Sequence, residues 1–147
     1  MRADRVVTRA SAALRLREEV VLSKRPLISI VDDDESVRVA TESLVRSLGF
    51  EAAAFASGEE LLRWERLGEA DCVVTDVQMP GMSGLELQAR LIDDGRALPV
   101  IFITAFPEER LRRRAEAAGA YGFLSKPFDG TDMINCLDAA LGRHAGR

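Results

Sequence analysis

The segment Leu27-Ile28-Ser29-Ile30-Val31-Asp32-Asp33-Asp34-Glu35-Ser36 decides the fold class of this 147-residue chain. An apolar run changes directly into four acids and then into apolar residues at helical spacing, which predicts a buried strand followed at once by a helix. From residue 26 onward the chain repeats this alternation. Such a pattern is typical of parallel strands joined by crossover helices, so we expect an α/β protein.

Five strands and five helices fit this pattern. We expect strands at residues 27–31, 51–56, 72–75, 100–104 and 121–124, helices at 36–48, 83–91, 108–118 and 131–141, and a further helix that opens at 57–60. Gly49 is suited to the left-handed stop of the first helix. The Ser-Gly-Glu-Glu sequence at 57–60 has the pattern of a capping box. Together the five units predict a flavodoxin-like doubly wound five-stranded parallel sheet, (βα)5, in a single domain.

Charge is distributed unevenly along the chain. Residues 1–25 carry a net charge of +4, whereas the other 122 residues carry −8. We expect residues 1–25 to form a basic extension that is weakly helical or disordered, residues 26–142 to form the domain, and residues 143–147 to form a tail. An acidic body is poorly suited to nucleic acid, because phosphate binding draws on clustered Lys and Arg. The uncharged runs are too short to span a membrane, so we expect a cytoplasmic protein without membrane contact.

Polar side chains stand where the predicted strands end. Asp32 and Asp33 follow the first strand, Asp76 the third, and Lys126 the fifth, while Thr104 ends the fourth. In an open parallel sheet the ligand crevice lies beyond these ends, so we expect the side chains to meet there. Carboxylates about 5 Å apart repel by roughly 3 kcal/mol at an effective dielectric near 20, which favours recruitment of a cation. Oxygen ligands that leave coordination positions open for water and phosphate favour Mg²⁺. Beside such an ion, Asp76 would be an anionic nucleophile able to form an acyl phosphate.

These residues resemble the receiver domains of response regulators, and most of all the FixJ-like group. The resemblance covers about residues 26–141. It is carried by Val31-Asp32-Asp33, Thr75-Asp76-Val77-Gln78-Met79-Pro80-Gly81-Met82-Ser83-Gly84, Thr104-Ala105 and Lys126-Pro127-Phe128. The resemblance implies that Asp76 accepts a phosphoryl group from a phosphohistidine on a sensor histidine kinase or a phosphotransfer protein. It also implies that Asp33, Asp76 and the backbone carbonyl of Gln78 bind Mg²⁺ directly, with Asp32 acting mainly through water.

The resemblance assigns further roles near the other strand ends. Thr104 and Lys126 would hold the phosphoryl oxygens, and the Lys126-Pro127 peptide bond is expected to be cis. Phe123 matches the family's switch aromatic. The output surface would be the fourth helix, the fifth strand and the fifth helix, which would contact a downstream protein partner or form a homodimer. Phe106 replaces the small or polar residue often found two positions after Thr104, and we expect it to overhang the site and slow attack by water.

Two other function classes compete with this interpretation. A phosphatase of the haloacid-dehalogenase type also uses an aspartate after a parallel strand, but it requires a second aspartate where this chain has Gln78. A receiver-like interaction module that is never phosphorylated would be free to lose Asp76, Thr104 and Lys126. We therefore expect a protein that assists its own phosphorylation and is not a turnover enzyme. FixJ-like regulators normally continue into a DNA-binding domain, so we expect either a stand-alone receiver or a shortened form of a longer regulator.

Overall fold

The computed structural model describes residues 25–142, and within them one sheet of five parallel strands has the order β2-β1-β3-β4-β5. The strands are β1 (Leu27–Val31), β2 (Glu51–Phe55), β3 (Cys72–Asp76), β4 (Val100–Thr104) and β5 (Gly122–Ser125). The strand order reverses its direction at β1, which lies between β2 and β3. The predicted flavodoxin-like doubly wound sheet is therefore confirmed.

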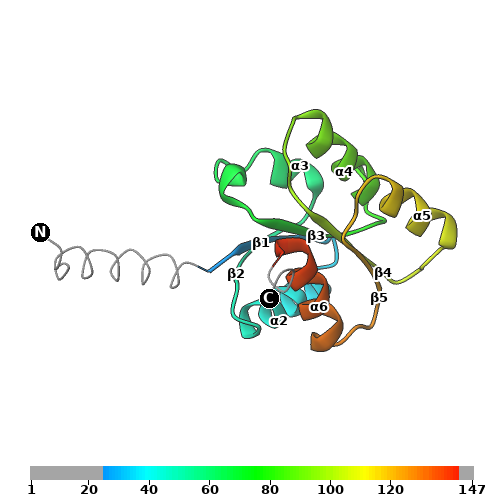
Figure 1. Cartoon of the computed structure of the whole chain (residues 1–147). Helices are drawn as coiled ribbons and strands as arrows, with labels where there is room; N and C mark the ends of the chain where they lie inside the picture. Colours follow the sequence, from blue (N-terminus) through cyan, green and yellow to red (C-terminus); the bar gives the residue numbers. More distant parts are fainter. Residues whose placement is uncertain (1–24, 143–147) are drawn as a thin grey trace, which may run out of the picture.

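Helices cover both faces of the sheet (Figure 1). One face carries α2 (Glu35–Ser47) and α6 (Gly130–Leu141), and the other carries α3 (Gly58–Leu62), α4 (Gly84–Asp93) and α5 (Glu109–Ala117), with a 3-10 turn, η1 (Leu67–Glu69), after α3. Two apolar clusters result, with Met133 and Leu137 of α6 in the first and Leu87 of α4 in the second. Because β1, β3 and β4 are covered on both faces, every residue in them is buried.

The ends of several elements differ from the predicted ends. β3 includes Asp76, so this aspartate is the last residue of a buried strand. β5 begins at Gly122, and Tyr121, which was predicted to lie in the strand, precedes it with 52% of its surface exposed. The predicted left-handed stop after the first helix is present, because Gly49 has a φ of 100°.

The predicted capping box at α3 is only half formed. The Ser57 side chain accepts a hydrogen bond from the Glu60 backbone N–H at 3.1 Å, as expected. The Glu60 carboxylate instead accepts from the N–H of Ala56, also at 3.1 Å, one residue earlier than the pattern requires. The helix is also short, since it ends at Leu62.

The expectations for the two ends of the chain lie outside the described residues. These concern the basic extension, of which residues 1–24 are not described, and the tail at residues 143–147. Within residues 25–142, no helix combines the length and the apolar character that a bilayer crossing requires.

Candidate functional site

Three carboxylates meet at the edge of the sheet where β1 and β3 end. Asp32 and Asp33 directly follow β1, and Asp76 ends β3, its neighbour in the sheet. One oxygen from each carboxylate lies within 4.8 Å of the other two. Asp32 is fully buried and Asp76 is 8% exposed, whereas Asp33 is open to solvent. The two buried carboxylates therefore need compensation that water does not supply.

Lys126 supplies part of that compensation. Its Nζ donates hydrogen bonds to Oδ2 of Asp32 and to Oδ2 of Asp76, each at 3.0 Å. Burial raises the pKa of Asp32. Burial opposes the charge on Lys126, but the hydrogen bonds to Asp76 and Asp32 outweigh it and raise the pKa of Lys126. Lys126 thus stays an ammonium ion that bridges the ends of two strands.

The turn after β1 is fixed by its own hydrogen bonds. Oδ1 of Asp32 accepts from the N–H of Asp34 at 2.9 Å, and the Arg38 guanidinium donates to the backbone carbonyl of Asp32 at 2.8 Å. Asp34 caps α2 by accepting from the N–H groups of Ser36 and Val37. The hydrogen bond from Ser36 lowers the pKa of Asp34. In the acidic run, Asp34 therefore caps α2, while Asp32 and Asp33 belong to the carboxylate cluster.

The backbone around Asp76 is equally constrained. The Gln78 N–H donates to Oδ1 of Asp76 at 3.2 Å, which orients the carboxylate. The Gly84 N–H donates to the carbonyl of Val77 at 2.8 Å, and a Cβ on Gly84 would overlap the carbonyl oxygen of Asp76. Only glycine permits this close approach, which brings the start of α4 against the end of β3.

Thr104 lies at the end of β4, beside β3. It is 1% exposed, and its Oγ1 accepts a hydrogen bond from the N–H of Phe106 at 3.1 Å. Its backbone carbonyl accepts from the N–H of Lys126 at 2.8 Å, so β4 and the segment after β5 are tied together. The Lys126-Pro127 peptide bond is cis. The hydroxyl of Thr104 has no direct hydrogen bond to the three carboxylates among those formed by the described residues.

Phe123 lies apart from the carboxylates. It is 8% exposed in β5, and its ring centroid is 6.2 Å from that of Phe102. The Arg112 guanidinium of α5 lies 5.6 Å from the same ring centroid. Phe123 therefore packs inward beneath α5, where a cation and an aromatic ring stabilise its position.

The donor set fits a hard divalent cation. Asp32, Asp33 and Asp76 offer oxygen ligands only, and Lys126 balances just one of their three charges when all are ionised. Mg²⁺ prefers oxygen ligands and keeps several waters, which an exposed Asp33 allows. The part of the Gln78 backbone carbonyl in this site stays a prediction.

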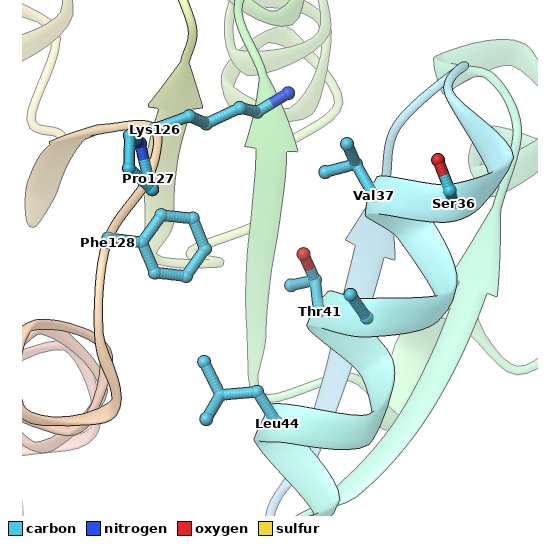
Figure 2. Close-up of a pocket in the computed structure, with 8 residues that line it drawn as sticks. Ser36, Val37, Thr41, Leu44, Lys126, Pro127 and Phe128 are labelled. Carbon is cyan, nitrogen blue, oxygen red and sulfur yellow. The ribbon is translucent and has the colours of Figure 1, made fainter.

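An apolar groove adjoins Lys126 (Figure 2). It has a volume of about 450 Å³ and lies between α2 and the segment after β5. Figure 2 shows the Phe128 ring facing Thr41 and Leu44 of α2, while Lys126 extends toward the strand ends. Ala40 of α2 lines this groove and is exposed. The first helix therefore covers the sheet with only part of its apolar stripe.

Two contacts at the site were not predicted from the sequence. Arg38 holds the backbone carbonyl of Asp32, and its place in the first turns of α2 was a usable signal, because a helix returns a side chain toward its own start. Glu59 in α3 accepts a hydrogen bond from the N–H of Met82 at 3.3 Å. Glu59 and Met82 are 23 residues apart, and no local pattern pairs them.

Comparisons with known proteins agree on one family. The model of the family described as response regulator receiver domain matches residues 28–138. Nodulation protein W of Bradyrhizobium diazoefficiens is 37% identical over 125 residues, which are 85% of this chain and 55% of that protein. The transcriptional regulatory protein FixJ of Azorhizobium caulinodans is 37% identical over 118 residues, which are 80% of this chain and 56% of that protein. The chain thus spans about half the length of the curated relatives it matches.

Solved structures give the same result. A response regulator receiver protein from Burkholderia phymatum is 45% identical, with a TM-score of 0.69. The match covers 80% of this chain and 96% of that one. The similarity therefore includes both the residues and the arrangement of nearly the whole described region.

Proposed function

The chain belongs to the response regulator receiver domain family, and on that premise we propose that Asp76 accepts a phosphoryl group from a phosphohistidine of a sensor histidine kinase or a phosphotransfer protein. Receiver domains of two-component systems interact with such partners, are phosphorylated on aspartate with Mg²⁺, and are generally not turnover enzymes. The observation that carries the proposal is the meeting of Asp32, Asp33, Asp76 and Lys126 at one edge of the sheet. The receiver occupies residues 26–142.

The transfer forms one bond and breaks one. A carboxylate oxygen of Asp76 attacks phosphorus, the P–N bond to the donor imidazole breaks, and the imidazole keeps the electron pair and takes up a proton from solvent. The Lys126 ammonium, which is 3.0 Å from Oδ2 of Asp76, is placed to pair with a phosphoryl oxygen. The Thr104 hydroxyl donates a hydrogen bond to another phosphoryl oxygen. Both groups stabilise charge on the transferring oxygens.

The Mg²⁺ ligands in this proposal are carboxylates of the cluster and one backbone carbonyl. Asp33 and Asp76 would bind the ion directly, together with the backbone carbonyl of Gln78. Asp32, which is completely buried, would act mainly through water. When bound, the ion supplies positive charge beside the phosphoryl oxygens and lowers the repulsion that opposes the attack of one anion on another.

The phosphoryl group then changes the face formed by α5, β5 and α6. Its charge near −2 draws the Thr104 hydroxyl toward it. Because Oγ1 of Thr104 accepts from the N–H of Phe106, the loop before α5 moves with it. Phe123 and the Arg112 guanidinium over its ring then rearrange beneath α5. A downstream protein or a second copy of the chain reads this change.

The donor approaches across the groove of Figure 2. The groove adjoins Lys126, and its lining is largely apolar, with Val37, Ala40 and Leu44 on one wall and Phe128 on the other. Apolar surface next to a reactive group is suited to the apolar face of a partner helix. A histidine on that helix would then lie near the exposed side of the site.

Intact mass measurement tests the phosphoryl transfer. We expect incubation with acetyl phosphate or phosphoramidate and Mg²⁺ to add one phosphoryl group to the chain, and EDTA to prevent it. Asp76→Ala should abolish the addition, because it removes the nucleophile. The matched control is Asp93→Ala, which removes an exposed aspartate of α4 and should leave the addition unchanged.

The same reaction separates the competing functions. Continuous release of phosphate from many substrates, without a phosphorylated chain, would support a phosphatase instead. Failure of the chain to gain a phosphoryl group from any small donor or from a phosphorylated kinase would contradict the proposal and support an interaction module.

A further inference from the structure

The loop that follows Asp76 is held firmly at both of its ends. At its start the Gln78 N–H donates to Asp76, and at its end Ser83 caps α4 through a reciprocal capping box with Glu86. Between these points stand Pro80 and Gly81, and Gly81 has a φ of 74°. The middle of the loop therefore depends on contacts from outside its own sequence.

The start of α3 provides those contacts. Oε2 of Glu59 accepts a hydrogen bond from the N–H of Met82 at 3.3 Å. A Cβ on Gly81 would lie 3.1 Å from the same oxygen, so the carboxylate lies directly against the Gly81-Met82 backbone. On the preceding residue of α3, a Cβ on Gly58 would lie 3.1 Å from Sδ of Met82. Helix and loop are thus in close contact at two successive residues.

We propose that Glu59 is a positioning residue that fixes the loop between β3 and α4 and thereby sets the affinity of the site for Mg²⁺. The inference rests on the proposed function, because the loop contains Gln78, whose backbone carbonyl is the expected third ligand. Glu59 touches neither the ion nor the phosphoryl group. It acts on the loop four residues after Gln78, through the N–H of Met82.

The chemistry of the contact favours this role over simple packing. A carboxylate accepts a stronger hydrogen bond from a backbone N–H than a neutral group does. Glu59 is half-buried, and no ion pair with a Lys or Arg is formed by it among residues 25–142. Residues that support metal ligands from behind commonly change metal affinity by about 10-fold to 100-fold when they are replaced. We expect an effect near the lower end, because one hydrogen bond is removed.

Three variants of Glu59 and one control test the proposal. Calorimetric titration with Mg²⁺ measures the Kd of each full-length chain. Glu59→Ala should raise the Kd about 10-fold. Glu59→Asp should raise it similarly, because the shorter side chain withdraws the carboxylate from Met82. Glu59→Gln keeps the reach but offers only a neutral acceptor oxygen, so its Kd should lie between those of wild type and Glu59→Ala. Glu60→Ala is the matched control, since its carboxylate caps Ala56 and should leave the Kd unchanged.

Hydrogen exchange gives a second measurement that does not involve the ion. In EDTA, Glu59→Ala and Glu59→Asp should speed exchange in residues 77–83, and Glu60→Ala should not. Circular dichroism establishes that each variant is folded. The inference is overturned if Glu59→Ala and Glu59→Asp bind Mg²⁺ like wild type, or if Glu60→Ala weakens binding equally. A wild-type chain that neither binds Mg²⁺ nor gains a phosphoryl group overturns the proposed function itself, so the two failures are distinguishable.

Discussion

Asp32 shows how one residue prepares the site. It is completely buried, which raises its pKa, yet its two oxygens bind the Lys126 ammonium and the Asp34 N–H. Burial of a carboxylate is costly unless it is paired and hydrogen-bonded, and here both conditions are met. Asp33, one residue later, is open to solvent. Two adjacent aspartates at the end of one strand thus have opposite exposure to solvent.

Phe106 is expected to shield the phosphorylated site from water. Its N–H binds Oγ1 of Thr104, and 69% of its surface is exposed at the rim of the site. We expect Phe106→Ser to speed dephosphorylation roughly threefold, which corresponds to less than about 1 kcal/mol of barrier, because a large apolar group no longer restricts water. The measurement is the half-life of the phosphorylated chain by intact mass.

Tyr121→Ser is the control for this change, since Tyr121 is an exposed aromatic residue that precedes β5 and does not adjoin Thr104 in sequence. Its half-life should equal that of wild type. An unchanged half-life for Phe106→Ser would show that the ring does not shield the phosphoryl group.

The side chains at the strand ends could be predicted because their position follows from topology alone. Asp32, Asp76 and Lys126 follow apolar runs, and the carboxyl ends of parallel strands share one edge. The contact between Glu59 and Met82 could not be predicted, because it depends on how α3 packs against a loop 23 residues away. The site residues at the strand ends can therefore be predicted from the sequence, whereas the tertiary contacts that support them cannot.

Among the elements, α2 is only partly covered by the sheet. Four of its apolar residues recur at helical spacing, but of Val37, Ala40, Leu44 and Val45 only Val45 is fully buried. The other three line the groove beside Phe128. The period identified the face correctly, but it could not tell which part the sheet covers, because that depends on the course of the chain after β5.

The groove beside α2 is the proposed contact surface for the phosphodonor protein. Ala40→Glu should slow phosphoryl transfer from a phosphorylated histidine donor protein about tenfold, which is equivalent to ~1.4 kcal/mol, because a charge is placed in an apolar contact surface. Transfer from acetyl phosphate should be unchanged, since a small donor needs no groove. Rapid-quench measurement of both reactions compares them.

Val39→Glu is the matched control on the same helix. Val39 is 52% exposed and is absent from the groove, so its replacement should affect neither donor. Equal slowing by Val39→Glu would indicate a general effect of charge on α2, and no slowing by Ala40→Glu would place the donor elsewhere.

Across the whole molecule, one edge of the sheet brings together side chains from four of the five strands. The strand order brings the ends of β1 and β3 together, and β4 and β5 add Thr104 and Lys126 beside them. Like charges are thereby held close by a rigid core on both faces. A cation that binds the folded chain and not the unfolded one must then stabilise the entire domain.

This linkage predicts a thermal effect. Mg²⁺ at 100 times its Kd should stabilise the fold by about 2.7 kcal/mol, which raises the Tm by on the order of 10 °C for a domain of this size. Differential scanning calorimetry with Mg²⁺ and with EDTA measures the shift. Asp33→Asn should remove most of it, and Asp93→Asn should not. The same shift in Asp33→Asn would locate the ion at another site.

The central claim is that Asp76 becomes an acyl phosphate. Reduction of the phosphorylated chain with borohydride, followed by peptide mapping, tests it most directly, because an acyl phosphate is reduced to an alcohol and aspartate becomes homoserine. The account predicts homoserine at position 76 alone, formed only when both the phosphodonor and Mg²⁺ were present. Homoserine at another aspartate, or a phosphorylated chain that yields none, would contradict it.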